Sequence, residues 1–151
     1  MIKIKNSQKK IKLDVQFIKK FCQQALDILK YADFDLGILF ATPKVIQKYN
    51  KEYRGKDKPT DVLSFSYHTN LKPGKRIRPE TEEDKNLGDL IICPEYVDSD
   101  SKKFNVTFED RLKLILVHGI CHLLGYDHEN DKDYRQMRAK EVFILKKLEQ
   151  L

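Results

Sequence analysis

One segment limits the possible folds of this chain more than any other: residues 107–124, TFEDRLKLILVHGICHLL. Thr107 and Asp110 stand in the relation of a capping box, which predicts that a helix begins there. From Leu112 to Leu124 the segment is apolar on almost every side and is interrupted by two histidines. A helix that is apolar all round lies inside a protein, so we expect this one to run through the core.

The histidines of this helix belong to a longer motif. Three of the four histidines in the chain lie in HGICHLLGYDH, residues 118 to 128, spaced as H-x-x-x-H-x-x-G-x-x-H. His118 and His122 are one helical turn apart and about 40° from each other around the axis. Gly125 can adopt the left-handed conformation that ends a helix, so that His128 folds back towards the same point. The spacing therefore predicts that the three imidazoles converge.

Three converging imidazoles predict a metal site. Catalytic zinc sites commonly use three protein ligands and leave a fourth position for water, so we expect one Zn²⁺ per chain, with nickel or another divalent ion as alternatives. His68 is a weaker candidate for a fourth ligand. Asp127 or Glu129 is expected to accept a hydrogen bond from a ligand imidazole. Where this motif has Gly119, the metzincin zinc proteases have their general-base glutamate, and no other residue stands out as a base.

The rest of the sequence predicts a small α+β protein. Short apolar or alternating segments predict strands at 1–6, 35–41, 60–67 and 87–94. Amphipathic spacing predicts further helices at 14–32, 43–53, 94–103 and from about 130 to the C-terminus. The polar residues 68–86 predict a mobile loop. We expect one domain, residues 1–151, in which a mixed sheet of about four strands is packed by helices, with a zincin-like central metal-binding helix.

Composition limits where the protein works. No apolar stretch approaches the roughly 20 residues needed to cross a bilayer, and the N-terminus lacks the pattern of a signal peptide, so we expect a cytoplasmic protein that binds no membrane. The three cysteines form no C-x-x-C pair. They predict reduced thiols rather than disulfides or a thiolate zinc site. A formal net charge of +6 favours an anionic partner.

Positive charge gathers at one predicted helix end, in KYNKEYRGKDK, residues 48–58. Arg54 ends the helix, Gly55 turns the chain, and Lys56 and Lys58 follow. A guanidinium can hold two phosphate oxygens in its planar fork, which a lysine cannot. From position alone, however, Arg54 is better explained by an interaction with the helix dipole. The two lysines are candidates for a general attraction of RNA phosphates.

Three segments together resemble the YbeY family of bacterial endoribonucleases: YNKEYRGKDKPTDVLSFSY, LGDLIIC and HGICHLLGYDH. They occur in the family's order. The resemblance implies a metal-dependent endoribonuclease that cleaves single-stranded RNA in rRNA maturation, particularly at the 3′ end of small-subunit rRNA, and in ribosome quality control. It also implies that ribosomal RNA is a partner, together with the ribosome or small-subunit assembly proteins.

The resemblance assigns roles to individual residues as well. It implies that His118, His122 and His128 bind the metal and that Arg54 is the functional arginine. Asp61 lies in the same matching segment as Arg54. We expect it to hold Arg54 or position a water, although a cap at the start of a strand explains it equally well.

Two other functions fit part of the sequence. A metzincin-like zinc peptidase fits the ligand spacing, but Gly119 replaces the protease base and the chain is basic. A non-catalytic ribosome-assembly factor, stabilised by zinc, fits the basic turn and the histidines. An open coordination position would count against this second alternative, because structural zinc sites are closed by four protein ligands.

The histidine frame predicts about one divalent metal ion per chain in the purified protein. Elemental analysis after mild dialysis tests this stoichiometry. Replacing His118, His122 or His128 with alanine should lower the metal content, because each replacement removes one of three ligands. Wild-type protein without metal, or three single variants that all retain it, would exclude the site.

Overall fold

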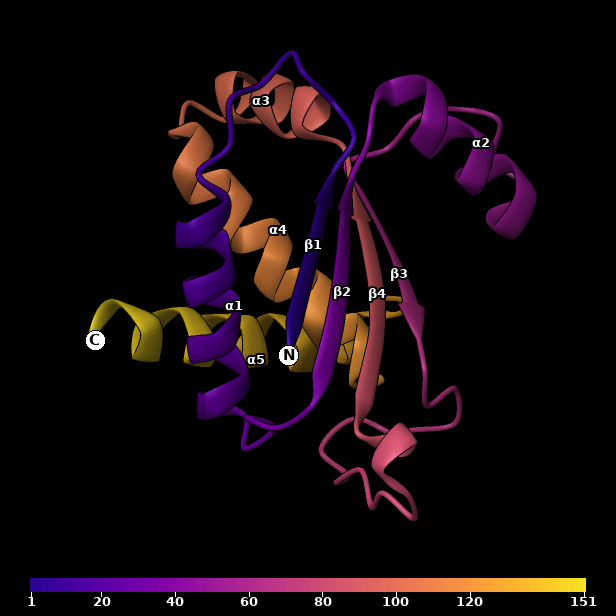
Figure 1. Ribbon diagram of the computed structural model, residues 1–151, viewed down its shortest axis with the longest axis vertical. Helices are drawn as coiled ribbons and strands as arrows, with labels where there is room; N and C mark the ends of the chain where they lie inside the picture. The colour runs from indigo at the N-terminus through magenta and orange to yellow at the C-terminus, as the bar shows by residue number, and fades with distance from the viewer.

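The computed structural model describes residues 1–151, and its strands form one sheet in the order β1-β2-β4-β3 (Figure 1). Three strands are parallel: β1 (Ile2–Asn6), β2 (Asp35–Phe40) and β4 (Asn86–Ile92). The last strand, β3 (Val62–Ser66), runs antiparallel to β4 and forms an edge of the sheet. The expected mixed sheet of about four strands is confirmed.

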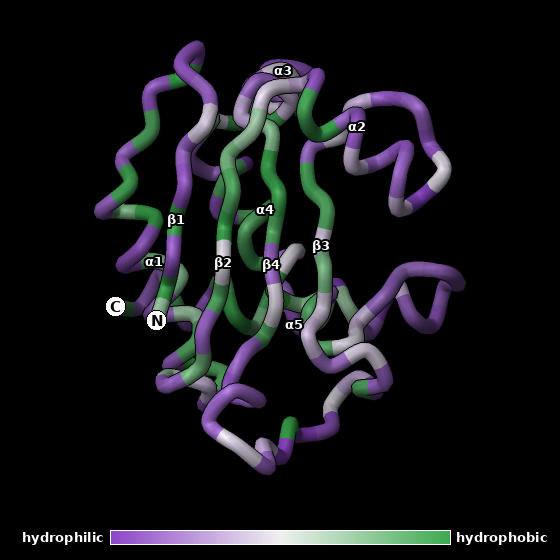
Figure 2. Tube along the Cα trace, turned by 45° about the vertical axis from the view of Figure 1, so that its right-hand side comes forward, coloured by the Kyte–Doolittle hydropathy of each residue, from purple (hydrophilic) through white to green (hydrophobic).

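Five helices pack around this sheet: α1 (Val15–Ile28), α2 (Pro43–Arg54), α3 (Pro94–Lys103), α4 (Phe108–Leu123) and α5 (Asp131–Glu149). The main core contains buried residues of α1, α4 and α5 together with one face of the sheet. A smaller cluster joins α2 to the opposite face through Ile46, Leu63 and Ile91. Figure 2 shows that the central strands β2 and β4 are hydrophobic over most of their length. None of the helices is long and apolar enough to cross a membrane.

Helix α4 runs through the main core, as its composition predicts. Its buried residues include Ile115 and Gly119 on one side of the helix and Val117 and Cys121 on the opposite side. Gly119 faces β4, where a Cβ atom would stand only 2.8 Å from the side chain of Leu90. The absence of a side chain at position 119 therefore lets the helix approach the sheet closely.

The first predicted helix, 14–32, is shorter than its pattern suggested. Helix α1 ends at Ile28, and Lys30 takes a left-handed φ of 67°. The backbone N–H of Tyr31 then bonds back to the carbonyl of Leu26 at 2.8 Å. This closure of the helix end turns the aromatic ring of Tyr31 into the core, where it is 3% exposed. The apolar periodicity continued past the helix because the turn itself is buried.

The long loop between β3 and β4, predicted to be mobile, is tied to α1 at its middle. The Arg76 guanidinium donates to the carbonyls of Leu29 and Lys30 at 2.9 and 2.7 Å and lies over the ring of Tyr31. The Tyr31 hydroxyl accepts the backbone N–H of Ile77. These contacts cap the end of α1 with residues from far along the chain, and a short 3₁₀ helix (Glu82–Asp84) completes the loop.

The sheet face opposite α4 is covered only in part. A cavity of about 490 Å³ lies between this face and α2. Its lining includes Lys3, Gly37 and Asp89 from the sheet and the aromatic rings of Tyr53 and Phe65. None of the histidines lines it.

Gly125→Ala is expected to destabilise the protein by about 3 kcal/mol, because strain and steric overlap add. Gly125 has a φ of 92°, and a Cβ atom there would stand 2.2 Å from the carbonyl oxygen of Leu71. Gly55→Ala is the matched control, since Gly55 has a φ of 68° with nothing within 4 Å of a Cβ. It should cost only about 1 kcal/mol of left-handed strain. Urea unfolding of both variants tests the difference, and equal losses would contradict it.

Candidate metal centre

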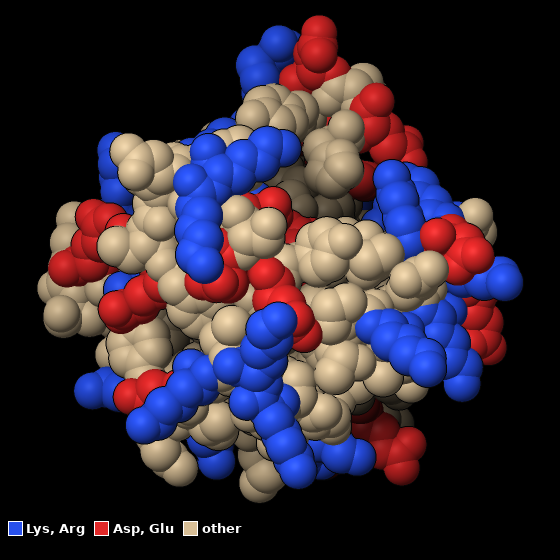
Figure 3. Space-filling model, turned by 90° about the horizontal axis from the view of Figure 1, so that it is seen from above, with Lys and Arg blue, Asp and Glu red and all other residues tan.

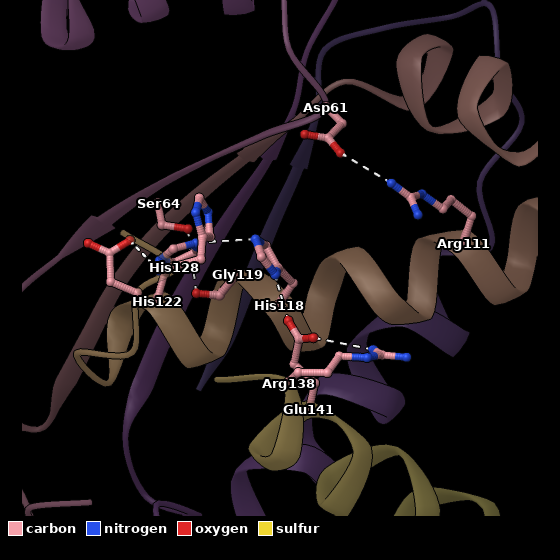
Figure 4. A network of polar contacts seen from close by, with 10 residues as sticks. Asp61, Ser64, Arg111, His118, Gly119, His122, His128, Arg138 and Glu141 are labelled. Carbon is pink, nitrogen blue, oxygen red and sulfur yellow. Dashed lines mark hydrogen bonds and ion pairs between the residues drawn. The ribbon is translucent and has the colours of Figure 1, made fainter. Parts of the chain in front are cut away.

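Three histidines from two segments meet at the C-terminal end of α4. His118 and His122 project from the helix, and His128 comes from the chain that follows it (Figure 4). One potential ligand atom of each residue lies within 4.8 Å of the others. The Nε2 atoms of His118 and His122 are 3.2 Å apart, close to the roughly 3.4 Å expected between two nitrogens on one tetrahedral zinc. The group can hold a single metal ion.

A buried glutamate contacts one of the three histidines on the side that faces away from the other two. The Nδ1 atom of His118 lies 2.5 Å from Oε2 of Glu141 in α5. The second carboxylate oxygen of Glu141 accepts from the Arg138 guanidinium at 3.3 Å. Figure 4 shows Glu141 on the side of His118 that faces away from the other two histidines. The carboxylate therefore contacts an imidazole and does not enter the space between the three rings.

Burial sets the protonation of the site. Burial lowers the pKa of His122 from 6.5 to about 4, with further lowering from the charges of His118 and His128. His122 is thus neutral near pH 7, as a metal ligand must be. Burial raises the pKa of Glu141, but the hydrogen bond and charge of His118, and then those of Arg138, lower it more. Its pKa lies below the ordinary value, so Glu141 is an ionised hydrogen-bond acceptor.

Other groups near the frame stay outside it. Cys121 is adjacent to His122, but burial raises its pKa to about 12, and a thiol rather than a thiolate is a poor ligand. The Nε2 atom of His68 contacts the carbonyl of Asp84. The Asp127 carboxylate accepts the backbone N–H of His128 at 2.8 Å, not an imidazole N–H. No fourth His, Cys, Asp or Glu joins the group of three.

The predicted basic turn lies on another element. Arg54 ends α2 with an exposed side chain, and Gly55 follows with a left-handed φ of 68°. Buried Asn50 donates to the carbonyl of Lys58 at 2.8 Å, which closes the turn. Lys56 and Lys58 are exposed. No hydrogen bond or ion pair joins this turn to the histidines, so the structure does not bring Arg54 into contact with the metal centre.

Asp61 has different partners from the one predicted first. Its Oδ1 atom accepts the backbone N–H of Val62 at 2.8 Å, the cap that was the alternative prediction. Its Oδ2 atom faces the Arg111 guanidinium at 3.8 Å, and Asp100 approaches the same group at 3.7 Å. Figure 4 shows this pair away from the histidines. Asp61 thus joins the start of β3 to α4 and makes no contact with Arg54.

Sequence reasoning missed Glu141 and Arg138. The sequence did contain a signal, namely a charged residue at a position where the helical spacing predicts an apolar one. Glu141 lies on the buried stripe of α5, four residues after Met137 and three before Ile144. Charged residues are almost never fully buried unless they are paired. A glutamate on an apolar helix face predicts a buried partner, although it does not say which one.

Surface charge alone does not mark the site. Figure 3, which views the end where α2 and α3 lie, shows lysines and arginines in separate groups with acidic residues between them. Several basic side chains are paired, among them Lys51 with Asp57 and Lys10 with Glu95. On this face the positive charge therefore forms no single continuous patch.

Comparison with known proteins finds relatives that match almost the whole chain. The model of the endoribonuclease YbeY family matches residues 3–149. An endoribonuclease YbeY of Homo sapiens is 37% identical over 96% of this chain and 86% of its own length. An endoribonuclease YbeY of Syntrophus aciditrophicus is 32% identical over 95% of this chain and 88% of its own length. The solution structure of TM1509 from Thermotoga maritima superposes with a TM-score of 0.64 at 28% identity, covering 98% of this chain and 89% of that one.

The fold and the site define a protein with a candidate metal centre on a buried helix, supported by a carboxylate from a second helix. With the family match over nearly the whole sequence, the chain belongs to the endoribonuclease YbeY family.

Metal-free protein is expected to lose stability as the pH falls from about 6.5 to about 4. Because the pKa of His122 is lowered to about 4 in the native state, the unfolded chain binds a proton in this window that the native chain does not. The loss is at most about 3 kcal/mol. Urea unfolding in excess chelator across this pH range measures it. His122→Asn should flatten the profile and exposed His128→Asn should not; unchanged profiles in both would contradict the assignment.

Proposed function

We propose that the protein is a metal-dependent endoribonuclease that cleaves single-stranded RNA in rRNA maturation, particularly at the 3′ end of small-subunit rRNA, and in ribosome quality control. The observation that carries this proposal is the three-histidine group, within 4.8 Å, at the end of a buried helix. Membership of the endoribonuclease YbeY family makes RNA the substrate class.

His118, His122 and His128 hold one metal ion in this proposal. Neutral imidazoles without a thiolate suit zinc, with nickel or another divalent ion as alternatives. A divalent ion bound there supplies Lewis-acid chemistry, lowering the pKa of water and polarising a phosphoryl oxygen. The side chains determine where the ion would bind. Glu141 orients His118 through its Nδ1 atom, and burial keeps His122 neutral.

The arrangement of β3 suggests the path of the RNA. This edge strand has α4 on one face, where Ser64 and Ser66 contact the carbonyls of Gly119 and His122. It has α2 on the other face, where Tyr53 packs edge-to-face on Phe65 at 5.3 Å. A flexible single strand that crosses this edge can reach the basic turn and the metal centre together.

Arg54 is the proposed catalytic arginine, and Lys56 and Lys58 attract the RNA backbone. The exposed guanidinium forms no ion pair in the protein and is free to hold two oxygens of one phosphate. Such a contact counters the negative charge that develops in the transition state. The bond between Asn50 and Lys58 keeps the turn in place beside α2.

Both alternative functions have less support. In the peptidase alternative, a glutamate at position 119 would point at Leu90 in the sheet, and Glu141 reaches the Nδ1 side of His118 rather than the space between the rings. The assembly-factor alternative requires a closed structural site, whereas three histidines form the group.

We also propose the domain organisation, the partners and the compartment of the protein. Residues 1–151 act as one unit around α4, which serves as a zincin-like metal-binding helix. The ribosome or small-subunit assembly proteins present the single-stranded RNA. The three buried cysteines, none of them paired, suit the reducing cytoplasm.

Arg54→Lys separates a catalytic arginine from mere positive charge, because it keeps the charge and removes the planar fork. We expect single-turnover cleavage of a single-stranded RNA to slow by a factor of roughly 30 to 1,000, about 2 to 4 kcal/mol. RNA affinity at one fixed salt concentration and metal content should change little.

Lys56→Ala is the matched control, since it should weaken binding more than chemistry. Duplex RNA and a peptide library complete the substrate set. Normal cleavage by Arg54→Lys would show that Arg54 only attracts phosphate, as proposed for Lys56 and Lys58. Metal-loaded wild-type protein that cleaves neither RNA would leave the assembly factor as the better explanation, and cleavage of peptides would favour the peptidase.

A further inference from the structure

Glu141 is a charged group in the core whose carboxylate is fully engaged. The residue is 4% exposed, and its oxygens contact His118 Nδ1 at 2.5 Å and Arg138 at 3.3 Å. Removing a carboxylate from water costs several kcal/mol unless partners compensate. The stability of the fold alone does not require an acid here, since apolar Met137 and Ile144 flank it on the same face of α5.

The contact decides which nitrogen of His118 carries a proton. The Glu141 carboxylate, whose other oxygen accepts from Arg138, is placed to accept a hydrogen bond from Nδ1–H of His118. With the proton on Nδ1, the ring presents its lone pair at Nε2, which lies 3.2 Å from Nε2 of His122. Without this contact either nitrogen could carry the proton. The Nε2–H form would point a hydrogen into the space that the metal requires.

We infer that Glu141 is the positioning residue of the metal centre: it locks His118 in the Nδ1–H tautomer and orients its lone pair at the shared ligand point. Arg138 holds the second oxygen and so fixes the rotation of the carboxylate. The side chain of Arg138 is 49% exposed, so its ion pair contributes orientation more than stability. This inference rests on the proposed metal site, which the experiment below tests separately.

A purely structural glutamate would behave differently. If Glu141 only joined α5 to α4, its replacement would lower the free energy of unfolding and leave the imidazole tautomer and the metal affinity of the folded protein unchanged. A positioning glutamate changes both in protein that remains folded. The tautomer can be read in the metal-free protein from the ¹⁵N shifts of the imidazole nitrogens.

The experiment compares full-length wild type, Glu141→Gln and Glu141→Leu. Glutamine keeps the size of the side chain but is uncharged, and its one amide oxygen must serve both donors, His118 and Arg138. Leucine removes the acceptor altogether. We expect the wild type to show the Nδ1–H form of His118 and the leucine variant to show the Nε2–H form or a mixture. Zinc affinity, measured by competition with a chromophoric chelator, should fall on the order of 10- to 100-fold in the leucine variant and by a smaller factor in the glutamine variant.

Glu149→Gln, an exposed change on the same helix, is the matched control and should leave both readings unchanged. If Glu141→Leu does not fold, Glu141→Gln decides: weaker zinc binding supports the inference, and unchanged binding overturns it. Unchanged tautomer and affinity in both variants would also overturn it. Wild-type protein that binds no zinc but shows the locked tautomer would reject the zinc site instead, while the role of Glu141 in fixing the imidazole would stand.

Discussion

The close packing of α4 against the sheet at Gly119 is the contact on which the site depends. A Cβ atom there would stand 2.8 Å from Leu90, so any other residue would force the helix away from β4 or displace a fully buried leucine. Because the helix sits this close, it fills the core on several sides and still presents His118 and His122 near its C-terminal end. The glycine costs about 1 kcal/mol of helix propensity relative to alanine. That cost is accepted where the sheet leaves no room for a side chain.

Placing polar groups beside this core has a further cost, which their partners offset. The hydrogen bond between the imidazole of His118 and the carboxylate of Glu141 offsets the cost of removing both groups from water. Arg138 donates to the remaining carboxylate oxygen. The contacts form a chain: Arg138 on the outer side of α5 holds the carboxylate of Glu141, and Glu141 in turn holds the imidazole of His118. Such a network is sensitive to partial removal, because one deletion leaves a buried polar group without its partner. The contacts of Glu141 with His118 and Arg138 thus satisfy these buried polar groups within the protein itself, without a metal ion.

Much of the fold was predictable because the decisive signals are local. The side chains of Asp14, Thr42, Thr107 and Asn130 all accept N-cap hydrogen bonds, and these residue types favour the position before a helix. The histidine frame is also local, since helix geometry and one glycine bring its members together. Glu141 is 23 residues from His118, and Asp61 is tied to Arg111 rather than to Arg54. Those pairings depend on how α5 and α4 are rotated and docked, which periodicity does not specify.

The separation of Arg54 from the histidines also follows from the architecture. Helix α4 packs on one face of the sheet and α2 on the other, so no side chain of α2 can reach the centre through the strands. The two groups can cooperate only around the free edge, and β3 is the strand at that edge. A substrate that links them must therefore be long, flexible and charged along its length. A single-stranded polynucleotide meets all three requirements, whereas a stacked duplex is too stiff to bend around one strand, since its persistence length is about 150 base pairs. If Arg54 and the histidines act on one RNA, as proposed, the preference for single strands comes from the sheet edge that the RNA has to cross, more than from the three histidines.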